Sequence, residues 1–342
     1  MNSTETTCGL FGPVREPILQ IHPSWWCNLR CKHCYSESSP WSREQLDHQL
    51  VCNAISDAAE LGCKVVSFSG GEPLLYRGLS PVLRHAKSLG LRTAVTTNGY
   101  FLQTERLADL DGCVDLLAVS VDGPPAVHNE VRGAKQAFER MQAGLENLRG
   151  AGFNFGILHT ATQTSWEQLP WLGEFAAAAG ARLLQVHPLE LAGRAKAEMN
   201  SLSPDAETLA KIYLLCFALA GKYEGNMRVQ CDLLHREHAI EAPGLVYAAE
   251  PQESLEVSIL VLQPDGWLVP VSYGFSRRYA VCDLKQTSLS AGWADFKARR
   301  YKDFRQLCQE VFDYVCSRQG PSLFNWHELI VAASHGQLAS HN

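Results

Sequence analysis

The stretch KVVSFSGGEPLLYRGLSPVLRHAKSLGLRTAVTTN, residues 64–98, contains a complete strand–turn–helix–strand unit. Its two ends, KVVSFSG (64–70) and LRTAVTTN (91–98), are short runs rich in β-branched residues, which is typical of buried strands. Between them, LSPVLRHAKSLG (79–90) has apolar residues three and four positions apart and ends in glycine, which predicts an amphipathic helix. Two strands joined through a helix are expected to lie parallel in one sheet.

The same unit repeats along the first half of the chain. Further strands are predicted at EPILQIH (16–22), VDLLAVSVD (114–122), FNFGILHTAT (153–162) and ARLLQVHPL (181–189), and further helices at 42–62, 105–111, 134–152 and 166–180. Six such units predict an α/β fold, a partial (β/α)6 barrel of the TIM type, with a doubly wound sheet as the alternative. Either fold places its chemistry beyond the carboxyl ends of the strands.

The rhythm changes after about residue 200. We expect a core at 16–200, a connecting segment at 201–226 that contains a helix at 207–223, and a small α+β cap at 227–342. Within the cap, 227–235 is strand-like, and 253–273 reads as two strands joined at Pro264-Asp265-Gly266, a strong hairpin turn. Residues from Leu289 to about Ser317 are expected to be helical.

The overall composition excludes several classes of protein. A chain of 342 residues with 46% hydrophobic and 19% charged residues is expected to fold as a globular protein. The net charge of −6 argues against a bulk nucleic-acid surface. The longest apolar stretch, 212–220, is too short for a membrane span and is expected to form a buried helix. MNSTETTCGL at the start lacks the features of a signal peptide. We therefore expect a cytoplasmic protein with reduced cysteines and without nucleic-acid or membrane partners.

Polar residues and glycines follow the predicted strands in turn. In strand order they are Cys27, Cys31 and Cys34; Ser69-Gly70-Gly71-Glu72-Pro73; Thr97-Asn98-Gly99; Ser120-Val121-Asp122-Gly123-Pro124; His159; and His187. Because the carboxyl ends of parallel strands meet at one edge, these residues are expected to form a single site. The two histidines are expected to be hydrogen-bonded strand-end residues without a catalytic role.

CNLRCKHCY, residues 27–35, spaces three cysteines at i, i+4 and i+7. A [4Fe–4S] cluster normally takes four cysteines, so three local ones with no obvious fourth would leave one iron open to a non-protein ligand. Zinc is the competing metal, although its structural sites usually draw two C-x2-C pairs. A third interpretation is a helix with a cysteine-lined face that only packs.

The same nine residues resemble the C-x3-C-x2-C loop of the radical SAM superfamily. Three further segments resemble that superfamily in the same order: GGEP (70–73), SVDGPPAVHNEVRG (120–133) and VHPLELAGRA (186–195). The second of these is similar to the SPASM/twitch branch, whose members include peptide-modifying enzymes. The resemblance extends from residue 16 to about residue 195.

The resemblance implies two cofactors and a set of binding residues. One [4Fe–4S] cluster would be held by Cys27, Cys31 and Cys34, and its open iron would bind S-adenosylmethionine (SAM). The segment Gly70, Gly71, Glu72 and Pro73 would receive the methionine amino group, while Ser120 and Arg132 would bind the carboxylate and ribose. His33 would lie against adenine. The remaining candidates for SAM contact are Tyr35, Asn98, Asp122 and Leu189. No catalytic side chain is predicted, because the first step needs no general base.

The cap departs from the SPASM/twitch pattern. Val271 stands where that branch has a cysteine, and Ser272 stands where sulfatase-maturing members have aspartate. Cys282, Cys308 and Cys316 are too few for two auxiliary clusters, so we expect a degenerate cap; Cys231 or a histidine is the candidate fourth ligand if one auxiliary cluster is present. The cysteines expected simply to pack in the core are Cys52, Cys63, Cys113 and Cys216.

The function implied by the resemblance is reductive cleavage of SAM, followed by abstraction of a substrate hydrogen by the 5′-deoxyadenosyl radical. The expected substrate is a ribosomal peptide that becomes cross-linked or epimerised. The alternatives are a small molecule or a cofactor-maturation substrate, and, from another class, an inactive binding protein on the same fold. A flavodoxin or ferredoxin is the expected electron donor. Since only about 20 residues precede the end of the first strand, a partner protein or the cap is expected to recognise the peptide.

Overall fold

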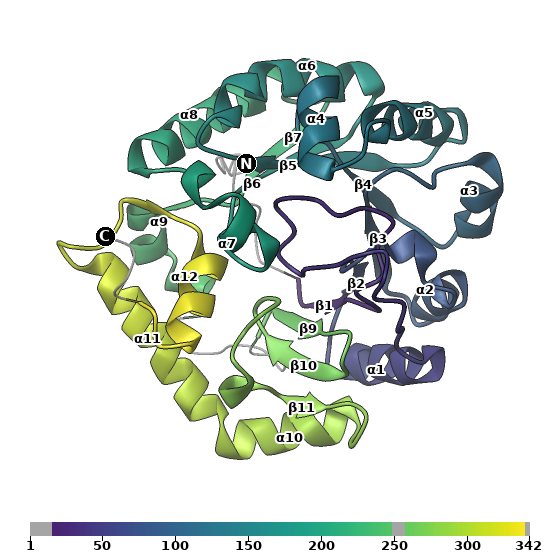
Figure 1. Cartoon of the computed structure of the whole chain (residues 1–342). Coiled ribbons are helices and arrows are strands. Elements are labelled where there is room, and N and C mark those ends of the chain that lie inside the picture. Colours follow the sequence, from purple (N-terminus) through teal and green to yellow (C-terminus); the bar gives the residue numbers. More distant parts are fainter. Residues whose placement is uncertain (1–15, 248–256, 339–342) are drawn as a thin grey trace, which may run out of the picture.

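The computed structural model describes residues 16–247 and 257–338. Seven parallel strands form its centre: β1 (Ile18–Ile21), β2 (Val65–Phe68), β3 (Arg92–Thr97), β4 (Leu116–Ser120), β5 (Phe155–Ala161), β6 (Leu183–Pro188) and β7 (Arg228–Cys231). The helices that alternate with them are α1 (His48–Glu60), α2 (Leu79–Ser88), α3 (Thr104–Leu110), α4 (Pro125–Arg132), α5 (Ala137–Gly150), α6 (Leu169–Ala179) and α8 (Ala206–Lys222). Figure 1 shows the helices ringing the curved sheet on its outside. The predicted α/β partial barrel is confirmed.

The first helix is shorter than predicted. It was expected at 42–62, but α1 begins at His48, where the Asp47 side chain accepts hydrogen bonds from the first backbone N–H groups. The preceding residues are extended instead, and Gln45 forms a β-bridge with Ser24. Helix α4 was not predicted, because PAVHNEVR carries too few apolar residues to show a helical period.

The central sheet continues through the boundary that was expected between core and cap. Strand β7 lies within residues 227–235 and pairs in parallel with β6, so β7 extends the barrel. The last two residues of this segment form β8 (Leu234–His235), which belongs to a separate antiparallel pair. On the other side, β9 (Ile259–Leu262) pairs in parallel with β1. The full strand order is β11-β10-β9-β1-β2-β3-β4-β5-β6-β7. Periodicity could not reveal this pairing because it joins segments about 240 residues apart.

The hairpin predicted at Pro264-Asp265-Gly266 is present. It joins β9 to β10 (Trp267–Pro270) in antiparallel register, and Gly266 has φ +93°, which favours glycine. Strand β11 (Cys282–Asp283) continues this sheet. Residues 253–256 of the predicted first strand, like MNSTETTCGL at the start, lie outside the described residues.

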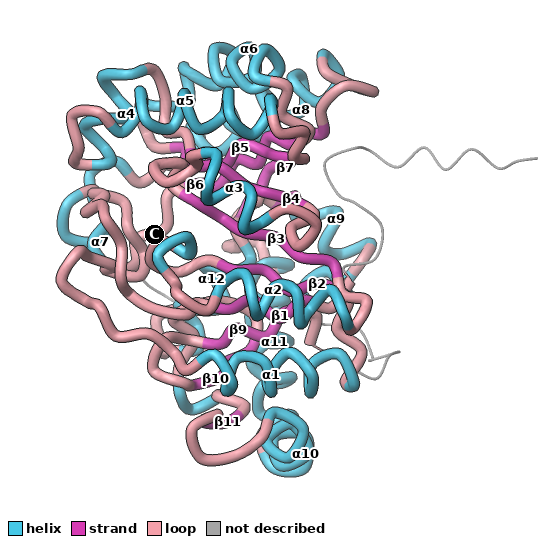
Figure 2. The backbone as a smooth tube through the Cα atoms, turned by 90° about the vertical axis from the view of Figure 1, so that its right-hand side faces the viewer, coloured by secondary structure: helices cyan, strands magenta, loops and turns pink. Residues whose placement is uncertain are grey.

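The carboxyl-terminal helices close the open side of the barrel. The predicted helical region corresponds to α10 (Leu289–Arg299) and α11 (Tyr301–Cys316). A further helix, α12 (Trp326–Ser334), packs on α11, and the short strand β12 (Leu323–Phe324) pairs with β8 (Leu234–His235); neither was predicted. Figures 1 and 2 place α11 and α12 across the space between β7 and the β9–β11 edge, together with the short helix α9 (Arg236–Glu241).

The apolar stretch 212–220 lies in α8 and is only partly buried. Ile212, Cys216 and Leu219 face the core, whereas Leu214 and Phe217 are 64% and 53% exposed. The expectation of a buried helix is therefore wrong for one face, since α8 covers the outside of the sheet and its other face meets solvent. Among the described residues, no helix has the length and apolar character needed to cross a membrane.

Candidate active site

The three cysteines of residues 27–35 lie in a loop at the carboxyl end of β1. The loop is not helical, so the interpretation as a cysteine-lined helical face is wrong. Cys27 and Cys31 are 8% and 7% exposed, and they pack with Leu29 into a small apolar cluster that Cys34 also contacts. Tyr100 and the alanine at 134 pack against the same cluster. The three thiols are thus gathered at one small apolar cluster.

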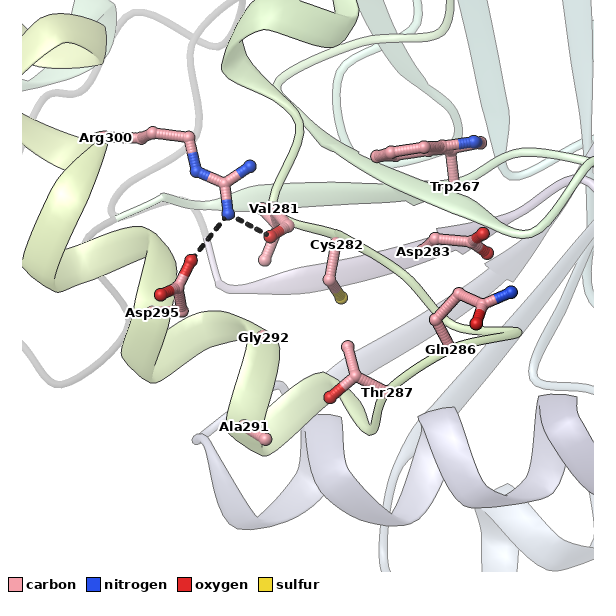
Figure 3. A pocket seen from close by; sticks show the side chains of 10 residues that line it. All are labelled: Trp267, Val281, Cys282, Asp283, Gln286, Thr287, Ala291, Gly292, Asp295 and Arg300. Atoms are coloured by element: carbon pink, nitrogen blue, oxygen red, sulfur yellow. Dashed lines mark hydrogen bonds and ion pairs between the residues drawn. The ribbon is translucent and has the colours of Figure 1, made fainter.

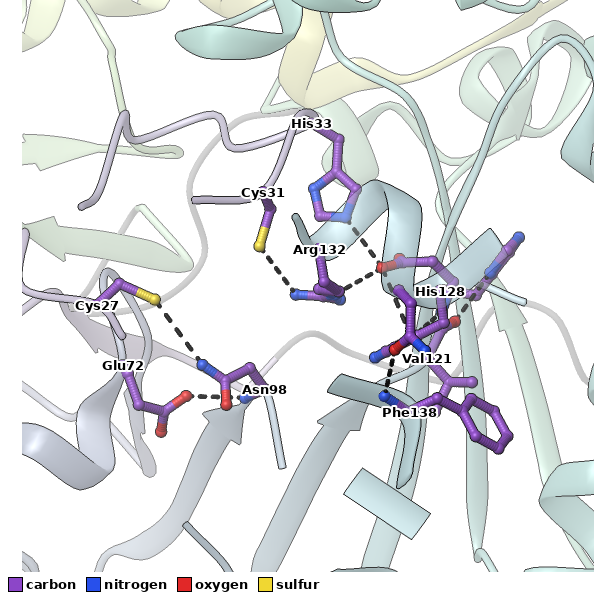
Figure 4. Close-up of polar contacts among 12 residues, drawn as sticks. Cys27, Cys31, His33, Glu72, Asn98, Val121, His128, Arg132 and Phe138 are labelled. Carbon is purple, nitrogen blue, oxygen red and sulfur yellow. Dashed lines mark hydrogen bonds and ion pairs between the residues drawn. The ribbon is translucent and has the colours of Figure 1, made fainter. Parts of the chain in front are cut away.

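Each of the three sulfur atoms has a hydrogen-bond partner of its own, and Figure 4 shows those of Cys27 and Cys31. The Cys27 sulfur accepts from the Leu29 backbone N–H at 3.5 Å and from Asn98 Nδ2 at 3.8 Å. Arg132 Nη1 donates to the Cys31 sulfur at 3.7 Å. The Cys34 sulfur lies 3.5 Å from the hydroxyl of Ser36. Donors aimed at sulfur are typical of thiolate ligands in iron–sulfur sites.

Burial raises the pKa of the Cys27 thiol and of the Cys31 thiol, and only for Cys31 does Arg132 oppose that shift. Thiols in such an environment stay protonated until a metal replaces the proton, since ligation requires the thiolate. Among residues 16–247 and 257–338, no three His, Cys, Asp or Glu side chains are placed so that they could together hold one metal ion. Three soft thiol ligands, apolar surroundings and hydrogen bonds directed at the sulfurs fit an iron–sulfur cluster.

Glu72 is the buried acid of the predicted GGEP segment. Its carboxylate accepts from Thr97 Oγ1 at 2.8 Å, from the Asn98 backbone N–H at 2.8 Å and from the Leu74 backbone N–H at 3.1 Å. Burial raises its pKa, and these hydrogen bonds oppose the rise. Glu72 therefore fixes the loop after β3, which carries Asn98. Its contact with a methionine ammonium stays a prediction.

The two glycines before Glu72 are required by the chain itself. Gly70 has φ +103°, and a Cβ on Gly71 would overlap the backbone carbonyl of Trp26. The Gly71 N–H donates to Ser24 O at 3.0 Å, which joins this segment to the start of the cysteine loop. Pro73 then opens a short 3-10 turn, Pro73–Leu75. The sequence suggested that these glycines admit a ligand, and the structure shows that they also admit the neighbouring loop.

Asp122 is the centre of a buried polar network (Figure 4). Its Oδ2 accepts from Arg132 Nε at 2.6 Å and from His33 Nε2 at 3.2 Å, while its backbone N–H donates to His128 Nδ1 at 3.2 Å. Burial alone would raise the pKa of Asp122, but Arg132 and then His33 hold it well below its usual range. Ser120 ends β4 just before this network. Arg132 was predicted to bind a SAM carboxylate, and here it engages Asp122 and a cluster thiol.

Two other predicted contacts lie on opposite sides of the loop. The Tyr35 hydroxyl is 3.2 Å from Ser69 Oγ, and its ring meets Tyr273 of the β10–β11 connection edge-on at 5.3 Å. Leu189 is 2% exposed and packs with Ala195 and Met199 just beyond β6. The structure therefore brings all the predicted residues to the carboxyl edge of the sheet, although the SAM contact of each one stays a prediction.

Arg194 was not predicted as a site residue, although it lies within a segment that drew attention. It begins helix α7 (Arg194–Glu198) and is 8% exposed. Its guanidinium donates to the carbonyls of Cys31 and Ser38, and its backbone N–H donates to the carbonyl of Cys34. An arginine in a small polar segment resembles any surface arginine, so no sequence signal marked it.

A second group of polar side chains surrounds the same edge of the sheet, and we call it the mouth cluster: His187, Glu190, Asp232, Asn325 and Glu328. His187 lies near the end of β6 and Asp232 directly follows β7; the two form an ion pair, with 32% and 30% of their side chains exposed. Asn325, the N-cap of α12, donates from Nδ2 to Glu190 Oε1 at 2.8 Å. Only His187 of this group was singled out, because the other members come from three separate segments.

The mouth cluster carries shifted pKa values. Burial, followed by repulsion from Glu328, raises the pKa of Glu190 to about 7. Burial also raises the pKa of Glu328. Burial would lower the pKa of His187, but Asp232 reverses this and raises it. Shifted pKa values gather at functional sites, so these side chains are candidates for substrate contact.

The cap cysteines lie apart from this edge. Cys282 is on β11, and Cys308 and Cys316 are on α11. Figure 3 shows Cys282 in a pocket of about 320 Å³ whose lining residues all come from 267–300, including the ion-paired Arg300 and Asp295. Cys63, Cys113 and Cys216 are buried as expected, whereas Cys52 is only half-buried.

The matched family model supports the site. Residues 21–168 match the model of the radical SAM superfamily. An AdoMet-dependent heme synthase of Oleidesulfovibrio alaskensis is 35% identical over 149 residues, which are 42% of this chain and 37% of that protein. An Fe-coproporphyrin III synthase of Methanosarcina barkeri is 27% identical over 302 residues, 83% of this chain and 75% of that protein. The mycofactocin maturase MftC of Mycolicibacterium smegmatis is 30% identical over 208 residues, 60% and 52% of the two chains. This chain thus spans only part of the length of these relatives.

Solved structures share the fold. Streptococcus suis SuiB bound to its precursor peptide SuiA has a TM-score of 0.67 at 15% identity, covering 91% of this chain and 75% of that one. Native anSMEcpe with bound AdoMet has a TM-score of 0.65 at 17% identity, covering 94% and 95%. Identities this low show the fold alone, and the family assignment rests on the matched domain and its cysteine loop. The cysteine loop lies within residues 21–168, the part of this chain that matches the radical SAM superfamily.

Proposed function

We propose that this protein is a radical SAM enzyme that acts on a peptide. The superfamily uses a [4Fe–4S] cluster and SAM. When bound, these cofactors supply a 5′-deoxyadenosyl radical that removes a hydrogen atom from an unactivated C–H bond. The observation that carries the proposal is the small apolar cluster that contains Cys27 and Cys31 and that Cys34 contacts, in which every sulfur has a hydrogen-bond partner.

The chain's own residues have three tasks in this chemistry. The cysteines hold the cluster, and Arg194 fixes the loop that carries them. Glu72 and Asp122 hold the segments after β3 and β4 against that loop. The helices α11 and α12 close the open side of the barrel, which shields the site from water and from stray hydrogen donors (Figure 2).

The mouth cluster favours a peptide over an anionic small molecule. It holds three carboxyl groups, Glu190, Asp232 and Glu328, against one basic side chain, His187. The cluster therefore keeps a net negative charge near neutral pH, although the pKa of about 7 leaves Glu190 partly protonated. Such a surface attracts amide N–H groups and basic side chains, and it repels carboxylates. A substrate that bears several carboxylates would meet unfavourable charge here. The solved structure of SuiB, which shares this fold, holds a precursor peptide.

A second candidate is a tetrapyrrole or another cofactor precursor. The observation that favours it is the match to the Fe-coproporphyrin III synthase, which covers 75% of that protein. The sulfurs, Glu72 and Arg132 would serve either substrate equally, so the cluster site does not discriminate. The charge of the mouth cluster is the feature that does.

The experiment has two stages. Anaerobic reconstitution is expected to give about four irons and four sulfides per chain, and the triple replacement of Cys27, Cys31 and Cys34 by alanine is expected to abolish them. Cys113→Ala, at a buried cysteine outside the loop, is the control. Zinc in place of iron, or iron retained in the triple variant, would refute the cluster assignment. Reduced protein should then release 5′-deoxyadenosine from SAM; no release at all would favour an inactive binding protein.

The second stage compares substrates. Release of 5′-deoxyadenosine is measured with synthetic peptides that match any short basic reading frame beside the gene, and with an iron porphyrin precursor of Fe-coproporphyrin III. We expect the peptide to stimulate release and to gain a new mass or an altered stereocentre. Stimulation by the porphyrin alone would replace the peptide with the second candidate. Flavodoxin and ferredoxin serve as the proposed electron donors in both assays.

A further inference from the structure

The three sulfur atoms of the cysteine loop have hydrogen-bond partners that differ in charge: two are neutral and one is a cation. Cys34 has the hydroxyl of Ser36, Cys27 has the amide of Asn98, and Cys31 has the guanidinium of Arg132. Figure 4 shows the amide of Asn98 directed at Cys27 and the guanidinium of Arg132 directed at Cys31. Only the bond to Cys31 comes from a cation.

Arg132 is held in this position by its own surroundings. It is the last residue of α4 and is 7% exposed. Its Nε donates to Asp122 Oδ2 at 2.6 Å, which leaves Nη1 directed at the Cys31 sulfur 3.7 Å away. Asp122 is fixed in turn by His33 and by His128. A planar fork held on one side by a carboxylate has little freedom to turn.

The end of α4 is also attached to the cysteine loop through the backbone. The Lys32 N–H donates to the carbonyl of Val131 at 2.9 Å, next to Arg132 in the chain. Gly133 ends the helix with φ +67°, and a Cβ there would lie 3.1 Å from the carbonyl oxygen of Arg30. The distance from Arg132 to Cys31 is therefore set by the docking of two segments and not by a flexible side chain.

A cation fixed beside a buried ligand sulfur stabilises the reduced state of a cluster, because that state carries more negative charge. Hydrogen bonds to the sulfurs act in the same direction. We propose that Arg132, positioned by Asp122, is a positioning residue that raises the reduction potential of the cluster through Cys31. This proposal rests on the proposed function, and it assigns Arg132 a role apart from the SAM carboxylate contact implied by the sequence.

The test compares two variants that remove one positive charge each. Arg132→Gln removes the cation at Cys31, whereas Lys32→Gln removes a cation of the same loop that is 40% exposed and paired with Glu130. The midpoint potential of each reconstituted cluster is measured in the absence of SAM by redox titration followed by electron paramagnetic resonance. We expect a more negative potential for Arg132→Gln and an unchanged one for Lys32→Gln, because solvent screens the exposed charge.

Two results would contradict the role proposed for Arg132, and a third would contradict the proposed function on which that role rests. An unchanged potential in Arg132→Gln with normal iron content overturns it, as does an equal shift in Lys32→Gln. Absence of a cluster in the wild type instead refutes the proposed function before any potential is measured. If Arg132→Gln does not retain iron, Arg132→Lys replaces it; we then expect a smaller negative shift, since one ammonium cannot bond Asp122 and Cys31 as the fork does. SAM binding to the oxidised variants separates the roles, because a carboxylate contact alone would weaken binding and leave the potential unchanged.

Discussion

Arg194 Nη1 donates to the backbone carbonyl of Cys31 at 2.7 Å, across 163 residues of sequence. The same side chain donates from Nη2 to the carbonyl of Ser38 at 2.8 Å, and the Arg194 backbone N–H reaches the carbonyl of Cys34 at 2.9 Å. Arg194, a single residue in the segment that follows β6, thus donates to three backbone carbonyls in the segment that follows β1. A loop without regular secondary structure needs such external partners for its backbone.

Replacing Arg194 by alanine should loosen the cysteine loop. Two buried carbonyls would lose a charged donor, which costs about 2–4 kcal/mol of unfolding free energy. We expect a lower Tm and a reduced iron content after reconstitution. Arg30→Ala is the matched control, because Arg30 belongs to the same loop but is 53% exposed and pairs with Glu198 at the surface. Equal losses in the two variants would contradict the assigned role of Arg194.

The cap cysteines are expected to bind no cluster. Cys282 lies on β11, whereas Cys308 and Cys316 are eight residues apart on α11, roughly 12 Å along the helix axis. Three thiols spread over these positions cannot reach one cluster together. Replacing these two and Cys316 by alanine should leave the iron content of reconstituted protein at the wild-type value. A loss of about four irons would reveal an auxiliary cluster, with Cys231 or a histidine as its fourth ligand.

Gly71→Ala is expected to displace the start of the cysteine loop. The added methyl group would overlap the carbonyl of Trp26 and would weaken the hydrogen bond from Glu72 N to that carbonyl, now 2.8 Å. We expect a loss of about 1–3 kcal/mol, as for other overpacked sites, together with weaker SAM binding. Gly221→Ala is the control, because Gly221 has open space at its Cβ position and no positive φ. Wild-type stability in Gly71→Ala would show that the two loops move apart freely.

The pKa of Glu190 predicts a pH dependence of stability. Because this pKa is about 7, above the ordinary 4.5, the native state binds the proton more tightly than the unfolded chain does. The resulting stabilisation is fully present below about pH 4.5 and is lost as the pH rises through 7. Glu190→Gln should remove this loss, so the variant gains relative to the wild type between pH 5 and pH 8. The gain is at most about 3 kcal/mol, and partial solvent access makes it smaller.

Urea unfolding at pH 5 and pH 8 measures this effect. His187 also loses stabilisation as the pH rises, since its pKa is raised too, but it does so in both proteins. Glu207→Gln, at a carboxylate that is 78% exposed and paired with Lys211, is the control and should show no such gain. A difference between Glu190→Gln and wild type that does not change with pH would contradict the shifted pKa.

The sequence by itself determined the local elements and the chemistry of the loop. The strand and helix periods predicted β1 to β6 and most of the helices between them, because burial on both faces of a parallel sheet leaves a continuous apolar run. The hairpin at Gly266 followed from turn chemistry. The spacing of Cys27, Cys31 and Cys34 is contained in nine residues, so it required no knowledge of the fold.

Only the tertiary structure decided which side chains meet those sulfurs. Arg132 lies 101 residues from Cys31, and Asn98 lies 71 residues from Cys27. The closure of the barrel by β9 against β1, and the approach of Asn325 to Glu190, likewise join segments that are far apart in the chain. Such contacts arise when whole helices and strands pack, and the free energy of that packing is spread over the core. No local pattern in the sequence records it.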